Sequence, residues 1–451
     1  MKSTTLRRVA PLAALPLVLA ACGGGGGSDA GGESGGGTTL SYWLWDANQQ
    51  PAYQQCADAF HEANPDITVE ITQNGWDDYW SGVSTGFVSE TAPDVFTDHL
   101  SKYPEFVTQG QLLPLDDYVA ADGVDLSQYS EGLADLWVGQ DGHRYGLPKD
   151  WDTVAIFYNA DMVADAGYAP EDLANLTWNP DDGGTYEQLI AHLTVDKNGV
   201  RGDEAGFDKN DVAVYGLGLP GSGGANGQTE WSMYTGTTGW THTDVNPWGT
   251  HYNYDDERFQ STIAWWYSLI EKGYMPPPET TVGASMNDDF GAGKYALNVN
   301  GSWMINSYYG YDGINVGLAP TPVGPSGERA SMFNGLADSI WAGTKHPDEA
   351  AKWVEFLGST ACQDLVGQAG VVFPAIPSSA ELAKTSFADR GIDVDPFMVQ
   401  VQDGTTFLFP ITDHAADVNA IMQPAMDAVM GGTADVSSLT EANDEVNALF
   451  N

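Results

Sequence analysis

Tryptophan and acidic residues adjoin one another at three places in the sequence, residues 45–46, 76–78 and 150–152. A sugar ring has apolar C–H faces, which pack on flat aromatic rings, and a belt of hydroxyl groups, which donate to carboxylates. A tryptophan in a hydrophobic core seldom needs acidic neighbours. The three segments therefore predict a site that holds a hydroxylated ring.

Paired carboxylates beside tryptophan are also what glycoside hydrolysis requires. Hydrolysis further needs a proton donor whose pKa is raised by an apolar surrounding, and the sequence shows no carboxylate set in one. It also shows no recognisable nucleophile motif. We therefore predict a binding protein without a cofactor, and a secreted glycoside hydrolase remains the less favoured alternative.

The eight histidines show neither the H-x-x-x-H nor the C-x-x-C spacing of transition-metal sites. Oxygen ligands for calcium gather at Asp196, Asn198 and Asp203. Their spacing is not that of an EF-hand, and Asn198 followed by Gly199 is better explained as a hairpin turn. The sequence therefore predicts no metal site.

The chain carries 62 acidic and 17 basic residues, a net charge of −45. No long basic run occurs, so nucleic acid is excluded as a partner. The field also disfavours an anionic ligand and suits a neutral or cationic one, such as a polyamine. A simpler alternative is that the charge keeps an exported protein soluble.

The first 22 residues have the pattern of a secretory signal. Residues 1–8 carry three basic side chains, and the apolar run 9–21 is too short for a membrane span and contains two prolines. Its end, residues 19–22, resembles the lipobox of bacterial lipoproteins, in which Cys22 is lipidated. Residues 23–37 are nearly all glycine and serine and predict a flexible tether.

The remainder begins with a β-α-β pattern. Residues 39–45 predict a strand, and Pro51 opens a helix that ends at residues 64–66. Alternation at residues 67–72 predicts a second, half-buried strand. Such a unit implies a parallel sheet flanked by helices, so the fold class is α/β.

Further elements follow the same alternation up to a stretch rich in glycine, aspartate and tryptophan at 181–249, which predicts long loops. The predicted strands are 93–97 and 153–158, and the predicted helices are 76–87, 259–270, one from Pro347, 416–430 and 438–450. With Cys22 used by the lipid, Cys56 and Cys362 remain. A disulfide and two separate thiols are both compatible with the sequence.

Five segments in this order carry a family resemblance: residues 59–71, 91–119, 146–163, 301–303 and 350–357. The chain resembles the extracytoplasmic sugar-binding proteins of ABC importers, the family that includes maltose-binding protein. The resemblance implies the two-lobe, type II periplasmic-binding-protein fold, with a hinge and a ligand cleft between the lobes. By alignment, the N-terminal lobe takes residues 38–150 and 330–360, and the C-terminal lobe takes 151–329 and 361–451.

The resemblance also implies ligand contacts, above all at Asp46, Asp98, Asp152 and Trp303. Asp46 has an alternative role as a helix N-cap, and long loops can bury aromatic residues without any ligand. The stretch 221–249 does not align cleanly, which leaves the pocket size open. The complete predicted set is Asp46, Trp76, Asp98, His99, Lys102, Trp151, Asp152, Trp231, Trp240, Trp303 and Phe409.

The function implied is capture of a carbohydrate outside the cytoplasmic membrane and its delivery to the permease subunits of an importer. The protein would be a monomer, held at the outer face of that membrane through its lipid alone and exposed to the extracellular or periplasmic space. Binding of a non-sugar solute is the main alternative.

Overall fold

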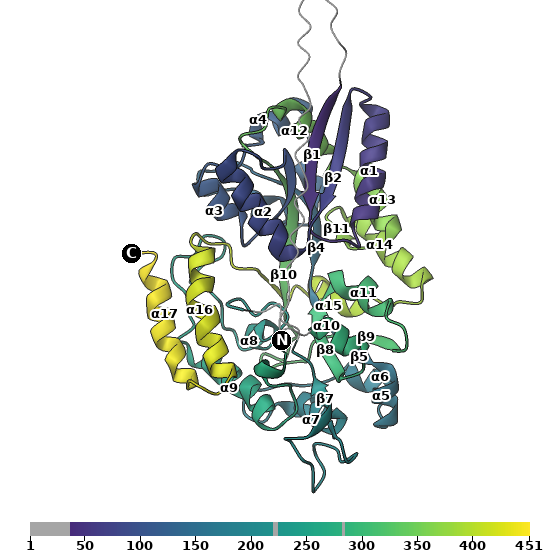
Figure 1. Cartoon of the computed structure of the whole chain (residues 1–451), viewed down its shortest axis with the longest axis vertical. Helices are drawn as coiled ribbons and strands as arrows, with labels where there is room; N and C mark the ends of the chain where they lie inside the picture. Colours follow the sequence, from purple (N-terminus) through teal and green to yellow (C-terminus); the bar gives the residue numbers. More distant parts are fainter. Residues whose placement is uncertain (1–36, 220–223, 282–284) are drawn as a thin grey trace, which may run out of the picture. The chain divides into compact units, whose positions relative to one another are not determined.

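The computed structural model describes residues 37–219, 224–281 and 285–451 (Figure 1). The predicted signal segment, the predicted lipidation site Cys22 and the predicted tether up to residue 36 lie outside the described residues. Within the described ranges, no helix has both the length and the apolar character needed to cross a membrane.

The predicted β-α-β start is present as β1 (Thr38–Leu44), α1 (Gln50–Ala63) and β2 (Ile67–Gln73). The two strands pair in parallel over their full length. Proline in the first turn fixes a backbone angle that suits helix entry. The buried face of α1 consists of Ala52, Tyr53, Cys56, Ala57 and Phe60.

The described strands form two sheets. In the seven-stranded sheet, β11-β4-β10-β3-β1-β2 lie in that order and β12 pairs with β10. The five-stranded sheet has the order β6-β7-β8-β5-β9. The further strands are β3 (Val95–His99), β4 (Leu147–Asp152), β5 (Val154–Asn159), β6 (Val195–Asp196), β7 (Val212–Leu217), β8 (Tyr295–Gly301), β9 (Val316–Ala319), β10 (Ser331–Ile340), β11 (Phe373–Pro374) and β12 (Thr406–Leu408).

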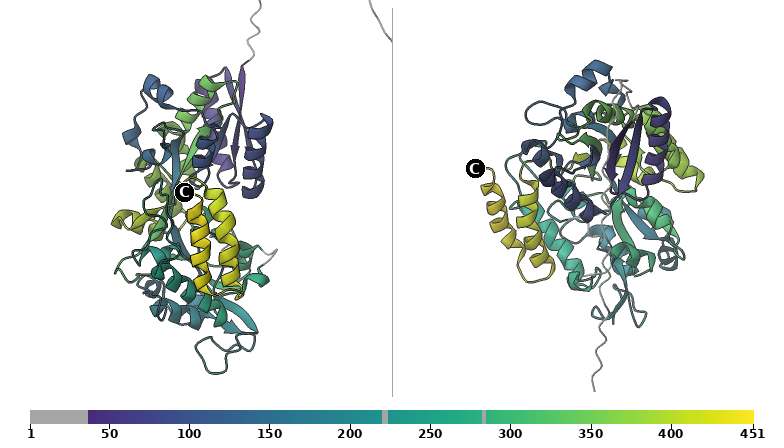
Figure 2. Two further views of the ribbon diagram at one scale, coloured as in Figure 1. Left: turned by 90° about the vertical axis from the view of Figure 1, so that its left-hand side faces the viewer. Right: turned by 45° about the horizontal axis from the view of Figure 1, so that its top comes forward.

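Helices flank both sheets, and the α/β class is confirmed (Figures 1 and 2). The further helices are α2 (Trp76–Ser89), α3 (Tyr103–Thr108), α4 (Asp116–Asp122), α5 (Ala160–Asp165), α6 (Pro170–Leu173), α7 (Gly184–Leu193), α8 (Ser232–Gly236), α9 (Glu257–Glu271), α10 (Met286–Gly291), α11 (Ile305–Tyr309), α12 (Pro347–Leu357), α13 (Thr360–Ala369), α14 (Pro377–Asp389), α15 (Asp395–Asp403), α16 (Ala415–Met430) and α17 (Leu439–Ala448). Single 3-10 turns lie at Leu126–Gln128, Ala134–Trp137, Pro278–Thr280, Ser302–Met304 and Val436–Ser438.

Residues of β1 alternate between the two faces of the seven-stranded sheet, as a strand requires. Leu40, Tyr42 and Leu44 pack in a core cluster with α1 and α12. Trp43 packs on the opposite side, in the cluster that contains α2 and α3. This alternation puts Trp45, just past the strand end, on the α2 side as well.

The chain passes from one sheet to the other with a single residue, Thr153, between β4 and β5. Trp151 and Asp152 pair with β10 and so lie in the seven-stranded sheet, which β11 and β12 also join. The lobe boundaries aligned from the family place all of these in the C-terminal lobe. These lobe boundaries stay a prediction.

A disulfide joins Cys56 in α1 to Cys362 in α13, with Cα atoms 5.1 Å apart. The bridge settles the question that the sequence left open. Both residues are fully buried in the core cluster beneath α1 and α12. The bond therefore ties the start of the seven-stranded sheet to a helix that follows 306 residues later.

Candidate functional site

Three tryptophans meet where β1 ends and α2 begins. The Trp45 ring centroid lies 5.1 Å from that of Trp76 and 5.5 Å from that of Trp80. Trp76 and Trp80 are four residues apart on one helix, and so they lie on the same face of α2. Trp76 is 44% exposed, the only tryptophan among the large exposed hydrophobic residues of the described ranges. It therefore offers an indole surface to solvent.

His99 and Phe409 extend this aromatic group, which we call the Trp45 cluster: Trp45, Trp76, Trp80, His99 and Phe409. The His99 ring lies 5.4 Å from Trp76 and 5.2 Å from Phe409. Phe409 follows β12, and its amide donates to the carbonyl of Phe333 in β10. The strand pairing of β12 with β10 thus brings together residues 310 positions apart in the chain.

Four side chains form a continuous polar chain from this cluster. Asn334 Nδ2 lies 3.0 Å from His99 Nε2 and donates to Asp152 Oδ2 at 3.1 Å. Gln228 Nε2 donates to Asp152 Oδ1 at 3.0 Å. The residues come from β3, β10, β4 and the segment before α8. We call His99, Asn334, Asp152 and Gln228 the polar chain.

Burial controls the ionisation of these groups. It raises the pKa of Asp152 well above the usual range, helped by the nearby charge of Asp150 and opposed by the bonds from Asn334 and Gln228. Burial, with the charge of Lys102, lowers the pKa of His99 to about 3. The imidazole is therefore neutral at physiological pH.

Asp98 and Lys102 lie at the edge of this site. Asp98 is fully buried, accepts the His99 amide N–H with Oδ1, and has no hydrogen-bond partner for Oδ2 in the described ranges. Burial raises its pKa to about 7, although the His99 amide bond opposes the shift. The Lys102 ammonium sits 5.7 Å from the ring centroid of Trp80. Lys102 therefore borders the aromatic surface, whereas Asp98 lies beneath it.

Asp46 closes the turn that leads from β1 into α1. Its carboxylate accepts the amide N–H of Asn48 at 2.7 Å and the Gln49 side-chain amide at 3.0 Å. The N-cap position of α1 is Gln49, so Asp46 does not cap the helix directly. Asn48 in turn donates to Ser307 of α11, three residues past the turn that carries Trp303. Trp303 itself is half-buried.

Trp151 is a core residue of the seven-stranded sheet. Its side chain is 4% exposed and stacks between Phe333 and Phe373, with centroid distances of 5.6 and 4.8 Å. The neighbouring Asp152 points to the other face of β4, as alternation requires. Only the acid of this pair therefore reaches the polar chain.

Trp231 and Trp240 lie in the core around α9. They are 0% and 4% exposed, and both rings lie against Phe259, at 5.0 and 4.9 Å. In this structure both are aromatic residues that a long loop buries without a ligand, which is the alternative that the sequence left open. Sequence alone did not reveal the covering helix.

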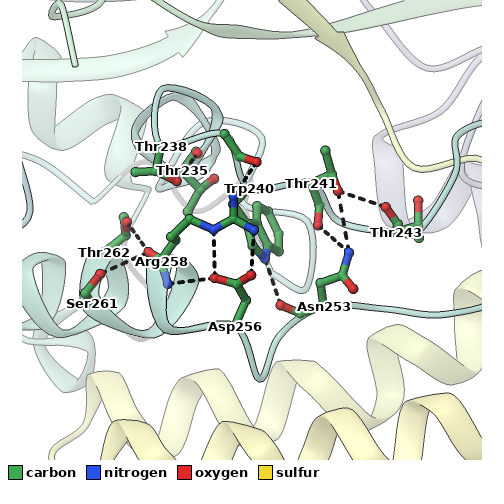
Figure 3. Close-up of polar contacts among 11 residues, drawn as sticks. Thr235, Thr238, Trp240, Thr241, Thr243, Asn253, Asp256, Arg258, Ser261 and Thr262 are labelled. Atoms are coloured by element: carbon green, nitrogen blue, oxygen red, sulfur yellow. Dashed lines mark hydrogen bonds and ion pairs between the residues drawn. The ribbon is translucent and has the colours of Figure 1, made fainter. Parts of the chain in front are cut away.

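Polar contacts hold the loop of Trp240 against the start of α9 (Figure 3). Trp240 Nε1 donates to the Asn253 carbonyl at 2.7 Å, and Arg258 donates to both oxygens of Asp256. Asp256 also caps α9, and Arg258 reaches the Gly239 carbonyl at 2.7 Å. These bonds fix Trp240 as part of the fold.

The suggested calcium ligands are used internally. Asp196 accepts the backbone N–H groups of Asn198, Val200 and Asp208. Asp203 pairs with His192. No group of three or more His, Cys, Asp or Glu side chains suited to a metal is found in the described ranges. The turn at Asn198 is confirmed.

A cavity of ≈ 250 Å³ lies apart from the Trp45 cluster, at the junction of α14 and α15. It lacks a flat aromatic platform for a sugar ring. The lining residues are Lys384, Ala388, Gly391, Ile392, Asp393 and Val394. We therefore place the candidate site at the Trp45 cluster.

Four residues of the site are missing from the predicted set of ligand contacts: Trp45, Trp80, Asn334 and Gln228. Trp45 adjoins Asp46, and Trp80 follows Trp76 by one helical turn, so both had a sequence signal. Asn334 and Gln228 lie 182 and 76 residues from Asp152 and had none.

A profile of the family described as bacterial extracellular solute-binding protein matches residues 46–364. The lactose-binding protein of Rhizobium radiobacter is 29% identical over 31% of this chain and 33% of its own length. The maltodextrin-binding protein MdxE of Bacillus subtilis is 25% identical over 66% of this chain and 64% of its own length. The match thus spans a third of the length of the lactose-binding protein and just under two thirds of the length of MdxE.

Among solved structures, an ABC substrate-binding protein of Listeria monocytogenes in complex with cycloalternan superposes with a TM-score of 0.78. It is 18% identical, and the match covers 92% of this chain and 99% of that one. The fold is therefore that of the type II periplasmic binding proteins, as predicted.

This chain belongs to the bacterial extracellular solute-binding protein family. Its relatives and structural neighbours are binding proteins and not enzymes, which agrees with the prediction made from the sequence.

Proposed function

We propose that this protein binds a neutral oligosaccharide at the Trp45 cluster and the polar chain. The observation that carries the proposal is the exposed indole of Trp76, which His99 and Asn334 connect to a buried carboxyl, Asp152, that is held by two side-chain amides. Indole faces suit the C–H faces of a sugar, and the carboxyl suits its hydroxyl groups.

The chemistry named for related proteins supports the same class of ligand. One relative is named for lactose, another for maltodextrin, and the structural neighbour holds cycloalternan. All three are neutral carbohydrates. None of these names identifies the particular sugar that this protein binds. We therefore propose only the class of ligand, a neutral carbohydrate.

Delivery to an ABC importer is part of the proposal, as is the anchor. Cys22 would carry the lipid at the outer face of the cytoplasmic membrane, and the glycine-rich tether would keep the protein near its permease. The family description as extracellular supports this placement.

We further propose lobes that follow the two sheets. The N-terminal lobe would include Asp152 and residues 360–389, because β11 pairs with β4 and the disulfide joins α13 to α1. Asp152 would then bind the ligand from the N-terminal lobe, and Gln228 would contact it from the C-terminal lobe.

A melting-temperature screen tests the proposed class of ligand. We expect a neutral oligosaccharide at about 100 times its Kd to stabilise the protein by roughly 2.7 kcal/mol and to raise the melting temperature by about 2 °C or more. Suitable probes are lactose, maltotriose, cyclic glucans and arabinooligosaccharides, compared with spermidine.

A rise with spermidine alone would refute the proposal in favour of a polyamine-binding protein. New reducing ends after incubation would refute it in favour of a hydrolase.

A further inference from the structure

Asn334 occupies a central place in the polar chain. It lies on β10, is 3% exposed, and stands opposite Asp152 in the register of β10 and β4. Its side-chain amide faces the imidazole of His99 on one side and the carboxyl of Asp152 on the other. One side chain from the middle strand therefore joins groups from the two strands that flank it.

The backbone shows which nitrogen of His99 accepts. The amide N–H of Ser101 donates to His99 Nδ1 at 3.0 Å, and the Ser101 hydroxyl, 2.8 Å from the same nitrogen, can donate to it as well. Nδ1 therefore accepts and carries no proton. A neutral imidazole carries one proton, which must then be on Nε2. This proton points at the Asn334 amide.

An Nε2 proton requires an acceptor, and Asn334 can supply one through its oxygen. Oδ1 is among the buried atoms without a hydrogen-bond partner in the described ranges. A half-turn of the amide exchanges Oδ1 with Nδ2 and brings the oxygen to His99 and Asp152. In both orientations one amide atom lacks a partner, but after the half-turn the Nε2 proton has an acceptor.

We propose that Asn334 is a positioning residue, whose amide oxygen accepts the Nε2 proton of His99 and the carboxyl proton of Asp152. The tautomer of His99 is thereby fixed, and Asp152 presents Oδ1, next to Gln228, to a sugar hydroxyl. The link between Asn334 and sugar binding rests on the proposed function. The tautomer of His99 does not depend on that function.

The arrangement also determines the class of ligand. In the proposed arrangement Asp152 keeps its proton beside a neutral imidazole, so the polar chain carries no net charge. An ammonium group would gain little there and would lose its hydration. The site therefore favours uncharged hydroxyl groups over a polyamine.

The test is long-range proton–nitrogen NMR on the full chain, labelled with ¹⁵N-histidine and studied without sugar. We expect His99 to give the Nε2-protonated pattern, with the signal assigned by its loss in His99→Gln. In Asn334→Asp the new carboxylate faces Nε2 and should raise the pKa of His99 enough for titration between about pH 5 and 8. The other charged or titratable groups around the ring are Asp98, Lys102 and Asp152.

Asn443→Asp is the matched control. Asn443 also has a buried side-chain amide, 1% exposed, but it lies on α17, where its oxygen accepts the Tyr254 backbone N–H. We expect this variant to keep the His99 pattern. It should also keep the affinity for maltotriose, which Asn334→Ala should reduce at least tenfold.

An Nδ1-protonated His99 in the unaltered chain would overturn the inference, as would an unchanged His99 signal in both Asn334 variants. If Asn334→Ala does not fold, the unaltered chain and Asn334→Asp still decide the tautomer. If the unaltered chain binds no carbohydrate at all, the proposed function fails. The spectra recorded without sugar still test whether Asn334 fixes the tautomer of His99.

Discussion

Replacement of Asp152 by alanine is expected to weaken oligosaccharide binding by about ten- to a hundredfold. The carboxyl lies in the middle of the polar chain, in hydrogen-bond contact with Asn334 and Gln228. Hydrogen bonds of an uncharged group contribute about 0.5 to 1.5 kcal/mol each, and about 1.4 kcal/mol corresponds to a tenfold change in Kd. We expect the sugar to make two hydrogen bonds with this carboxyl, and their loss gives a change of this size. Calorimetric titration measures it.

Asp152→Asn separates shape from chemistry. The amide keeps the size of the side chain and one acceptor oxygen, so we expect a smaller loss of affinity than with alanine. Burial raises the pKa of Asp152 in the folded protein. The native state therefore loses stability as the pH rises from the ordinary pKa of an aspartate in the unfolded chain to the raised pKa in the folded one. The asparagine variant avoids this cost and should melt no lower than the unaltered chain at pH 8. Equal affinity in all three proteins would exclude Asp152 from the site.

Replacement of Trp76 by alanine is expected to weaken sugar binding by about ten- to a hundredfold, about 1.4 to 2.8 kcal/mol, because an exposed stacking face is lost. The side chain is 44% exposed, so its removal takes little from the core. The melting temperature without sugar should fall only slightly. The change in affinity and the melting temperature are measured on the same protein.

Two variants control for effects on α2. Trp76→Phe keeps a flat ring and should retain most of the affinity. Val88→Ala alters the same helix at a residue that is 89% exposed, and it should leave binding unchanged. Wild-type affinity in Trp76→Ala would show that this indole does not touch the sugar.

The sequence predicted the local elements of the fold well, because local periodicity determines them. Alternation gave β2, and helical spacing gave α1 together with its buried face, from Tyr53 to Phe60. The parallel pairing of β1 with β2 followed from the β-α-β order. The sheet order was not predictable, since β10 joins β3 and β4 from far along the chain: Asn334 of β10 comes 235 residues after His99 and 182 after Asp152.

The residues of the candidate site were predicted only in part, because local sequence patterns do not show which distant elements come together. Asp152, His99, Trp76 and Phe409 are brought together, but Trp231 and Trp240 are not. A tryptophan in a loop has no periodicity that tells which element covers it, and here α9 does so through Phe259. The proposed site therefore leaves these two residues out.

Hydrogen–deuterium exchange with and without the sugar that most raises the melting temperature tests the central claim most directly. The account predicts slower exchange at the end of β1, the first turn of α2, the residues after β3 and the segment around Gln228. Protection confined to other segments, such as the junction of α14 and α15, would contradict it.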